Sequence, residues 1–267
     1  MTLDVAIPTH KADGILRLAS MDLPRVEGVR YVVSWQAPGG AVIPSQLADR
    51  EDVVIQITHG TGLSVNRNNA LDHSTADIVL NGDDDLIYYP EGLRAVIKTF
   101  EENPGLEMAS FMYDGADSKI YPTAECSLRK FPKGFYTTSF ELAFRRDSRA
   151  GGLRYDTRFG LNGTVFTIGE DDLLLMTARR RGYDVRFFPV MLCRHTGPTT
   201  GVRQITDPRS HRGTGAILAL EYPVTHPLRI VLKAWRGWRR GQMSLLPAIW
   251  HMAEGAVWAI FKFRRPW

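Results

Sequence analysis

The sequence predicts an α/β protein with a mixed, mostly parallel sheet flanked by helices and an amphipathic helical extension at the C-terminus. Two observations lead to this prediction. Short apolar runs alternate with amphipathic segments over the first half of the chain, which is the pattern of parallel strands joined by helices. Residues 228–267 differ from the rest, because five of the six tryptophans and eight Lys or Arg residues lie there. With 267 residues, 44% of them hydrophobic, the chain can bury a substantial core.

The first half of the chain is expected to alternate strand and helix. Four apolar runs predict strands, at residues 3–8, 30–34, 53–57 and 77–80. Three segments predict helices, at residues 11–20, 62–73 and 90–102. The last of these is the clearest, because Pro90 stands in its first turn and Asn103-Pro104-Gly105 ends it.

The second half is expected to complete the sheet. Residues 106–144 are rich in strand formers and aromatic residues, which predicts mixed sheet with turns. Residues 170–181 predict a helix, because acids occupy its first turn and arginines its last, before Gly182. Residues 183–192 predict a strand, and residues 196–214, rich in Gly, Pro, Thr and Arg, predict a loop.

The domain organisation expected is a body of residues 1–226 and a basic extension of residues 227–267. The extension carries +7 of formal charge and the body −3, which together make the net +4. Helices are expected at 228–240 and 245–263, the second too polar to span a membrane. Lys and Arg beside interfacial tryptophans favour helices that lie on an anionic membrane surface. Packing on the body and binding of nucleic acid are the alternatives; the apolar content disfavours nucleic acid.

The cysteines and the N-terminus bear on the compartment. Cys126 and Cys193 form no ligand pattern and favour a reducing environment. The first residues contain neither a basic segment nor a long apolar run, so no signal peptide is expected. With the extension, these features predict a cytoplasmic protein that is peripheral on the inner face of the cell membrane.

The chain contains two acidic clusters. Asp83, Asp84 and Asp85 follow the apolar run 78–80, and Glu170-Asp171-Asp172 opens the predicted helix. Like charges at the end of a buried strand repel one another unless a cation or a proton offsets them. Divalent cations are often held by carboxylates and by substrate phosphates together. The two clusters therefore indicate a metal site and a general base. A solvated turn and a set of helix N-terminal charges are the structural alternatives.

Several motifs, taken in order, resemble those of the family 2 inverting glycosyltransferases of GT-A fold, over residues 3–196. The resemblance implies a Rossmann-like sheet and a nucleotide-sugar donor. The motifs that carry it are Val5–Thr9, Gly62–Ala70, Asp83–Asp85, Arg154–Gly160 and Gly169–Asp171, followed by Arg179, Gly182-Tyr183, Pro189 and His195.

The resemblance implies roles for the first acidic cluster. Asp83 and Asp85 would be the pair of a DxD motif that coordinates Mn²⁺ or Mg²⁺ on the donor diphosphate, where the metal offsets charge on the leaving nucleotide. Asp84 would contact the sugar or the ribose. His195 matches a position that contributes to the metal or diphosphate site in some relatives.

The resemblance also implies a nucleotide pocket. Arg67 would face the nucleotide, and Pro8 and Thr9 would line the base pocket through their backbone. Many relatives end the second strand with an aspartate that recognises the base, whereas this strand ends in Ser34-Trp35-Gln36. Ser34 and Gln36 are then the candidates to hydrogen-bond the base, and uridine is the favoured base.

The second cluster would supply the catalytic base. Asp171 matches the family's base and Asp172 is its neighbouring alternative; the base would deprotonate an acceptor hydroxyl that displaces the nucleotide with inversion. The expected acceptor is a glycan or a lipid-linked glycan in envelope polysaccharide synthesis. The alternatives are a catalytically silent, membrane-bound scaffold and a sugar nucleotidyltransferase. The second is disfavoured because Val5–Lys11 lacks a Gly-rich phosphate loop.

Overall fold

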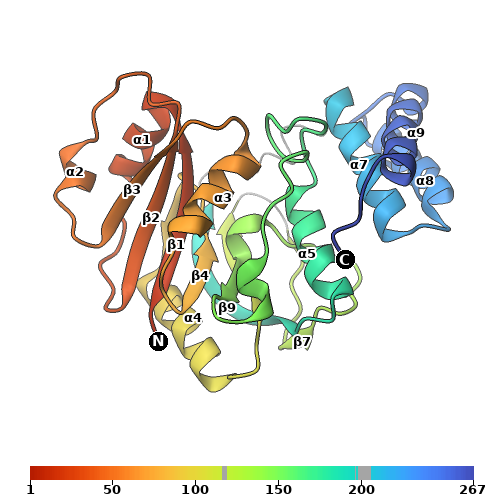
Figure 1. The fold of residues 1–267 in the computed structure, drawn as a ribbon. Coiled ribbons are helices and arrows are strands. Elements are labelled where there is room, and N and C mark those ends of the chain that lie inside the picture. Colours follow the sequence, from red (N-terminus) through yellow and green to blue (C-terminus); the bar gives the residue numbers. More distant parts are fainter. Residues whose placement is uncertain (116–118, 196, 198–205) are drawn as a thin grey trace. The chain divides into compact units, whose positions relative to one another are not determined.

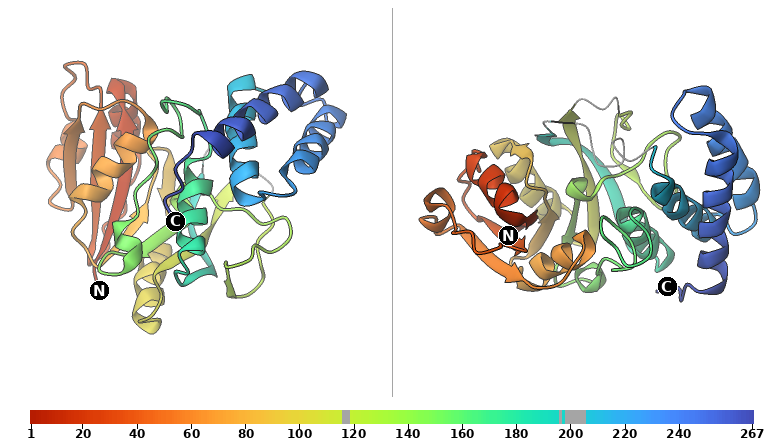
Figure 2. Two further views of the ribbon diagram at one scale, coloured as in Figure 1. Left: turned by 45° about the vertical axis from the view of Figure 1, so that its right-hand side comes forward. Right: turned by 90° about the horizontal axis from the view of Figure 1, so that it is seen from above.

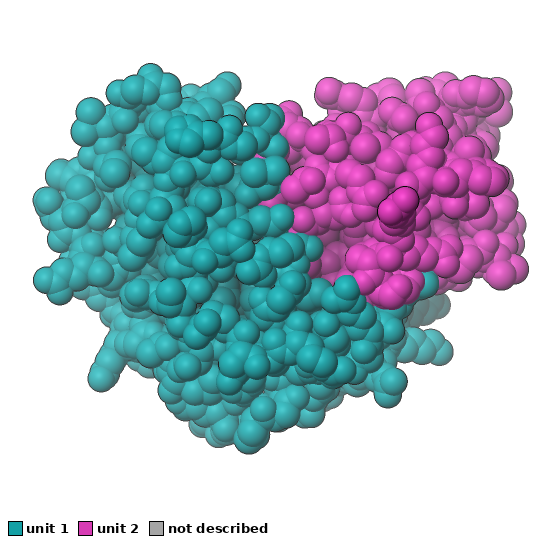
Figure 3. Space-filling view, viewed as in Figure 1, with its two compact units in different colours: residues 1–61, 65–154, 178–198 teal, residues 62–64, 155–177, 199–267 magenta. Residues whose placement is uncertain are grey.

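The computed structural model describes residues 1–115, 119–195, 197 and 206–267. The chain forms two compact units, coloured separately in Figure 3. The first, here called the sheet unit, comprises Met1–Thr61, Val65–Arg154 and Ala178–Pro198. The second, the helical unit, comprises Gly62–Ser64, Tyr155–Thr177 and Thr199–Trp267.

The sheet unit is built on a mixed sheet with strand order β3-β2-β1-β4-β8-β6-β9-β5, with β7 paired to β9 (Figure 1). The long pairings, of β1 with β2, β2 with β3 and β6 with β9, are parallel. The short β8 is antiparallel to both β4 and β6. The predicted α/β fold is therefore confirmed. The strands are β1 Leu3–His10, β2 Val29–Gln36, β3 Val53–Thr58, β4 Ile78–Asn81, β5 Leu86–Tyr88, β6 Met108–Gly115, β7 Cys126–Ser127, β8 Leu142–Arg145 and β9 Val185–His195.

The predicted helices of the first half are confirmed to within a residue or two at each end. Helix α4 begins at Pro90 and buries Leu93, Val96 and Phe100 against the sheet, as its 3.6-residue spacing predicts. The other helices in described residues are α1 Lys11–Ser20, α2 Ser45–Ala48, α3 Leu63–His73, α5 Glu170–Arg180, α7 Pro208–Glu221, α8 His226–Arg239 and α9 Leu245–Phe261, with short 3₁₀ turns η1 Ser139–Glu141 and η2 Arg149–Gly152.

The core of the sheet unit includes Trp35, which is fully buried and whose Nε1 donates to the Lys11 carbonyl oxygen at 2.8 Å. A ring held in this way is a core residue. Asp4, the acidic residue of β1, is fully buried. Its carboxylate accepts two hydrogen bonds from Arg30 and one each from the Thr75 and Ala76 backbone N–H groups. This buried charge is thus fully hydrogen-bonded, as burial requires.

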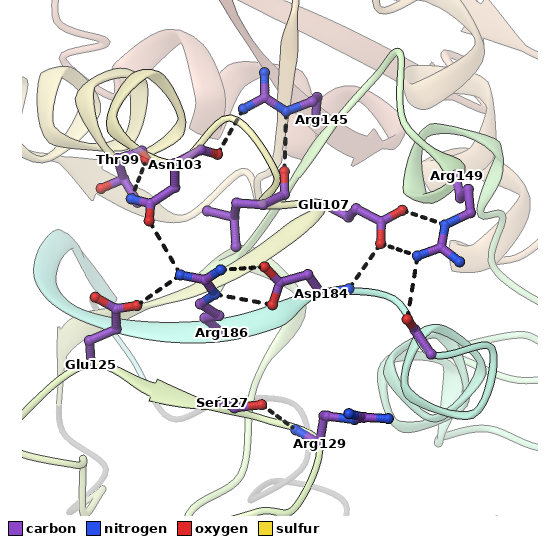
Figure 4. A network of polar contacts seen from close by, with 12 residues as sticks. Thr99, Asn103, Glu107, Glu125, Ser127, Arg129, Arg145, Arg149, Asp184 and Arg186 are labelled. Carbon is purple, nitrogen blue, oxygen red and sulfur yellow. Dashed lines mark hydrogen bonds and ion pairs between the residues drawn. The ribbon is translucent and has the colours of Figure 1, made fainter.

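A polar network joins the starts of β6 and β9 (Figure 4). Glu107 accepts from Arg149 at 2.5 and 2.8 Å and from the Asp184 backbone N–H at 2.9 Å. Arg186 makes a two-pronged contact with the Asp184 carboxylate and also reaches Glu125. These contacts lie at the strand starts of a parallel pair, so they stabilise the end of the sheet that is remote from the strand ends where ligands bind.

In the helical unit α7, α8 and α9 pack side by side (Figure 2). Helices α7 and α9 approach closely at two glycines: a Cβ at Gly215 would overlap the Met252 carbonyl oxygen, and one at Gly255 would overlap that of Arg212. The hydrophobic core of the helical unit includes Phe159, Phe166, Leu173, Met176, Ala216, Ala219, Leu220, Ile230, Ala234, Ala248, Met252, Ala256, Ala259 and Phe263.

The prediction of a loop over residues 196–214 is wrong for residues 208–214, because these residues form the first half of α7. Pro208 stands in its first turn and the Asp207 carboxylate accepts from the Arg209 backbone N–H at 2.9 Å, so the helix has a regular start. The glycines of this helix serve packing rather than a loop: Gly215 meets α9, and Gly213 meets Ile168 and Phe166. Residues 196 and 198–205 of the predicted loop lie outside the described residues.

The two predicted helices of the extension are confirmed as α8 and α9. The predicted boundary at residue 226 falls within the helical unit, and the division of the chain at that position stays a prediction. Among the described residues, no helix combines the length and the apolar character needed to cross a membrane.

Candidate functional site

The aspartates lie where parallel strands end. β4 is parallel to β1, and both strands run toward the edge that carries Thr9, at the end of β1, and Asp83 to Asp85, just after β4. The chain enters this edge through Gly82, where a Cβ would meet the Tyr88 hydroxyl at 2.5 Å. The sequence thus brings the acids to the side of the sheet at which α/β proteins bind ligands.

Asp84 is held by two partners. It accepts a hydrogen bond from Thr9 Oγ1 at 2.6 Å, and Arg17 of α1 donates to it from Nη2 at 2.6 Å and Nε at 3.1 Å. Burial raises the pKa of Asp84, while the hydrogen bonds from Thr9 and Arg17 oppose that rise. Asp84 therefore links β1, α1 and the acidic turn.

Asp83 lies beside Arg67 of α3. Arg67 Nη2 is 3.3 Å from the Asp83 carboxylate and donates to Ser139 Oγ at 2.6 Å. The side chain of Arg67 is 5% exposed, so its charge is compensated inside the protein rather than by water. The predicted Arg67 thus meets the acidic cluster through Asp83.

Asp85 lies beside His195. β5 is antiparallel to β9 with Leu86 paired to His195, and this register brings the preceding Asp85 to the imidazole, with His195 Nε2 3.5 Å from Asp85 Oδ1. The hydrogen bond to Asp85 raises the pKa of His195, with burial working against the rise. His195 Nδ1 contacts the backbone of Gly197, so Nε2 is the ring nitrogen that faces Asp85.

The Asp85–His195 pair can supply two ligands to a divalent cation, but the described residues do not supply a complete set of protein ligands. The described residues contain no cluster of three or more His, Cys, Asp or Glu side chains arranged to hold a metal. Asp85 and His195 supply one carboxylate and one imidazole that are already adjacent. Mg²⁺ in nucleotide enzymes is usually held by one or two carboxylates plus substrate phosphates and waters. The residues present therefore fit a cation that is completed by a bound diphosphate.

The predicted base-pocket residues are buried at the ends of β1 and β2. Pro8 pairs with Ser34 in the parallel ladder. Ser34 Oγ accepts from Asn69 at 2.8 Å, and Gln36 Nε2 donates to the Gly60 carbonyl oxygen at 2.7 Å. Both side chains thus make protein contacts that give the edge its shape.

Asn66 is a polar residue of this edge that sequence reasoning missed. Its Nδ2 donates to the Thr9 carbonyl oxygen at 2.8 Å, and its buried Oδ1 has no hydrogen-bond partner among the described residues. A polar side chain on the sheet-facing side of α3 was the signal that could have found it.

Asp171 and Asp172 belong to the helical unit, in the first turn of α5, which follows Gly169 at φ 99°. Asp171 is half-buried and Asp172 is exposed. Desolvation and the negative charge of Asp171 raise the pKa of Asp172 to about 6. Because the side chain of Asp172 retains solvent contact, screening by water works against this rise.

The motif Arg154–Gly160 has a structural role within its own part of the chain. Arg158 pairs with Asp156 at 2.5 and 2.8 Å, and its guanidinium lies 4.4 Å from the ring centre of Phe263. Gly160, at φ 101°, leaves room for Glu170 and Ser64. The motif therefore supports the start of α5.

Comparison with known proteins agrees with this fold. Residues 45–159 match the family model described as Glycosyl transferase family 2. No curated protein matches the chain significantly.

Solved structures with the same fold include two glycosyltransferases. S. aureus TarS residues 1–349 match at TM-score 0.56 and 16% identity, over 82% of this chain and 66% of that one, so this chain spans just under two thirds of TarS 1–349. The complex of that fragment with UDP-GlcNAc matches at TM-score 0.55 and 16% identity, over 82% and 67%. The mannosyltransferase PcManGT from Pyrobaculum calidifontis, in complex with GDP-Man and Mn²⁺, matches at TM-score 0.53 and 18% identity, over 97% and 81%. At these identities the likeness concerns the fold.

The mixed sheet and its likeness to these structures define a fold of GT-A type. The match to the model of glycosyl transferase family 2 covers less than half of the chain, so membership of that family is part of the proposal below.

Proposed function

We propose that the protein is a metal-dependent, inverting glycosyltransferase that moves a sugar from a nucleotide-sugar, with UDP favoured, to a hydroxyl of a glycan or lipid-linked glycan. The observation that carries the proposal is the pairing of Asp85 with His195 beside the Arg67–Asp83 contact, at the ligand-binding edge of the sheet. A nucleotide-sugar donor is further supported by the UDP-GlcNAc and GDP-Man complexes of the structural neighbours.

In this proposal Asp85 and His195 hold Mn²⁺ or Mg²⁺, with Asp83 next to them. A divalent cation at a diphosphate acts as a Lewis acid that offsets charge on the leaving oxygen. Arg67 keeps Asp83 in place and adds a positive charge close to the phosphates. Asp84, fixed by Thr9 and Arg17, orients the donor rather than binding the cation.

For the base, Pro8 and Thr9 offer backbone groups and Ser34 and Gln36 shape the pocket wall. Ser34 and Gln36 are uncharged and buried, so they suit recognition of the nucleobase by hydrogen bonds.

Asp171 is proposed as the catalytic base, with Asp172 as the alternative. A base must accept the acceptor proton as its hydroxyl attacks the anomeric carbon, and a carboxylate at a helix start is a suitable group. Asp171→Asn should abolish transfer while nucleotide binding stays at the wild-type level. Retained transfer in this variant together with its loss in Asp172→Asn would move the role to Asp172.

The membrane is proposed as the partner of residues 228–267. α8 and α9 each expose apolar side chains at helical spacing; Arg and Lys lie within α8 and follow the end of α9 at Lys262, Arg264 and Arg265, which suits an anionic lipid surface. A lipid-linked glycan acceptor at the cytoplasmic face, in envelope polysaccharide synthesis, would follow. The exposed apolar residues are Leu228, Val231, Leu232, Trp235 and Trp238 of α8, and Leu246, Trp250, Val257, Ile260 and Phe261 of α9.

The membrane proposal is best tested with the full chain, because the two helices also supply part of the helical core. Co-sedimentation with vesicles of anionic and of zwitterionic lipid would be compared for wild type, for Trp235→Asp with Trp250→Asp, and for the control Val42→Asp. Val42 is also an exposed apolar residue, but it lies in the sheet unit. Binding to anionic vesicles should be lost only in the tryptophan variant; equal binding of all three proteins would exclude these stripes.

The donor site is tested by calorimetry of UDP, GDP, CDP and dTDP, each with and without Mn²⁺. Asp85→Ala should remove the Mn²⁺-dependent part of the binding. Asp52→Ala is the matched control, because Asp52 is an ion-paired acid at the start of β3. Mn²⁺-independent behaviour of every nucleotide would overturn metal dependence, and no binding at all would favour a silent scaffold.

A further inference from the structure

The 3₁₀ turn η1 lies beside the acidic cluster because of the sheet topology. β8 is antiparallel to β4, with Leu80 paired to Ala143 and the Asn81 side chain donating to the Leu142 carbonyl oxygen at 3.1 Å. The residues that precede β8 therefore lie where the chain leaves β4, which is the position of Asp83. These preceding residues are η1, and all three are buried.

The side chain of Glu141 anchors the turn. Its fully buried carboxylate accepts from the Thr138 backbone N–H at 2.7 Å, which is one half of a capping box; the Thr138 side chain accepts from the Glu141 backbone N–H as the other half. The carboxylate also accepts from Thr138 Oγ1 at 2.8 Å. It also accepts from the Tyr121 hydroxyl at 2.6 Å and pairs with Lys119, whose side chain is 2% exposed. A charge pair buried this deeply fixes geometry more than it adds stability.

Lys119 is enclosed by aromatic rings. Its Nζ lies 4.5 Å from the ring centre of Tyr136 and 5.0 Å from that of Tyr121. Burial lowers the pKa of Lys119, and the charge of Glu141 opposes this change. The rings therefore hold the cation in one position against Glu141, which makes the base of the turn rigid.

The two other residues of the turn each contact one member of the candidate site. Ser139 Oγ accepts from Arg67 Nη2 at 2.6 Å, and Arg67 reaches Asp83 with the same nitrogen. The ring of Phe140 stacks on the imidazole of His195, with ring centres 5.5 Å apart and an interplanar angle of 11°. Ser139 thus contacts Arg67 and Phe140 contacts His195, while the next residue, Glu141, anchors the turn.

We propose that η1 is a positioning element with two separable arms: Ser139 orients Arg67 toward the donor nucleotide, and Phe140 fixes the imidazole of His195 for the divalent cation. This inference rests on the proposed function, because it assigns Arg67 and His195 to nucleotide and cation. Neither Ser139 nor Phe140 is a catalytic residue in this account. Each acts through the side chain that it holds.

Separate arms predict separate defects, which calorimetry of UDP with and without Mn²⁺ can resolve. Ser139→Ala removes an acceptor from a buried guanidinium and should weaken UDP binding about tenfold in both conditions. Phe140→Leu removes the stacking partner of His195. It should leave metal-free UDP binding unchanged and weaken the apparent affinity for Mn²⁺ about tenfold, as loss of a support to a metal ligand does.

Matched controls come from β6. Ser110 and Phe111 are both buried there, and Phe111 packs against Phe188 rather than the site. Phe111→Leu should lower the melting temperature about as much as Phe140→Leu, whereas Ser110→Ala should change it little, because Ser110 Oγ has no hydrogen-bond partner among the described residues. Both controls should leave the two binding constants at wild-type values. If either test variant fails to fold, Ser139→Cys or Phe140→Met replaces it, since both keep nearly the original volume.

The outcomes separate the inference from the function on which it rests. A wild-type protein that binds no nucleotide contradicts the proposed function, and the inference with it. A wild-type protein that binds UDP with Mn²⁺, while both variants behave like their controls, contradicts only the positioning role. If UDP affinity falls equally with and without Mn²⁺ in both variants, the two substitutions cause one general defect, and the two-arm account is overturned.

Discussion

Replacement of Asp172 by Asn is expected to stabilise the helical unit at neutral pH. The pKa of Asp172 is raised to about 6, first by desolvation and then by the negative charge of Asp171, with a smaller contribution from Glu221, while the positive charge of Lys233 opposes the rise. A raised pKa means that the folded state prefers the protonated carboxyl, so ionisation at pH 7 costs folding free energy. A shift from 3.8 to about 6 would correspond to about 3 kcal/mol if fully expressed. Because the residue is exposed, we expect about 1 kcal/mol after solvent screening.

The pH dependence gives the sign of this effect. Below the unfolded pKa of 3.8 both states hold the proton, so the stability associated with Asp172 is fully present. It is lost as the pH rises through about 6. Asp172→Asn should therefore match wild type near pH 4 and exceed it at pH 7. Urea denaturation followed by tryptophan fluorescence at both pH values measures the difference, since five of the six tryptophans lie in the helical unit.

The helix dipole makes the opposite prediction, which allows refutation. An acid in the first turn of a helix is stabilising by about 0.3–1 kcal/mol. Asp13→Asn, in the first turn of α1, is the control and should slightly destabilise the protein at pH 7. If Asp172→Asn also destabilises at pH 7, the dipole outweighs desolvation and the argument is wrong.

Three further outcomes follow from the structure. Arg67→Lys keeps the charge but loses the planar fork, so UDP binding by calorimetry should weaken about tenfold; unchanged affinity would mean that only charge matters. Asp4→Ala leaves Arg30 and two backbone N–H groups without their acceptor and should lower the free energy of unfolding by about 3–5 kcal/mol in urea, and a loss below about 1 kcal/mol would contradict the buried network. Gly215→Ala should force α7 away from α9 and cost about 2–3 kcal/mol. Gly152→Ala, which meets no atom within 4 Å, is its control, and equal melting temperatures would refute the close helix contact.

Much of the fold could be predicted from local sequence because local rules and tertiary structure agree there. β1, β2 and β4 are buried runs, and α4 carries both its start and its stop signal. The loop prediction fails for the first half of α7 because Gly213 and Gly215 pack closely against residues distant in the sequence, Ile168 for Gly213 and Met252 of α9 for Gly215. The three-residue β5 was missed because it is defined by its pairing with β9 rather than by its own composition.

The candidate site was predictable where a motif carries its own chemistry. Arg67 meets Asp83, and Asp85 meets His195 across more than a hundred residues of chain, while the roles of these residues stay predictions. η1 was missed although Thr138-x-x-Glu141 is a capping-box pattern. That pattern predicts a turn, whereas only the antiparallel pairing of β8 with β4 brings the turn to the site.

The three adjacent aspartates show most directly what a one-dimensional pattern leaves undetermined. Each carries the same charge, yet each meets a different partner: Arg67 of α3 for Asp83, Arg17 of α1 for Asp84, and His195 of β9 for Asp85. The partner decides whether a carboxylate can bind a cation, because two hydrogen bonds from an arginine already occupy much of its capacity. Of the three, Asp85 faces an imidazole, which is itself a metal ligand, so a cation can replace the proton between the two groups. For this reason Asp85 is a stronger candidate for metal binding than Asp84, although no difference in their composition or charge distinguishes them in the sequence.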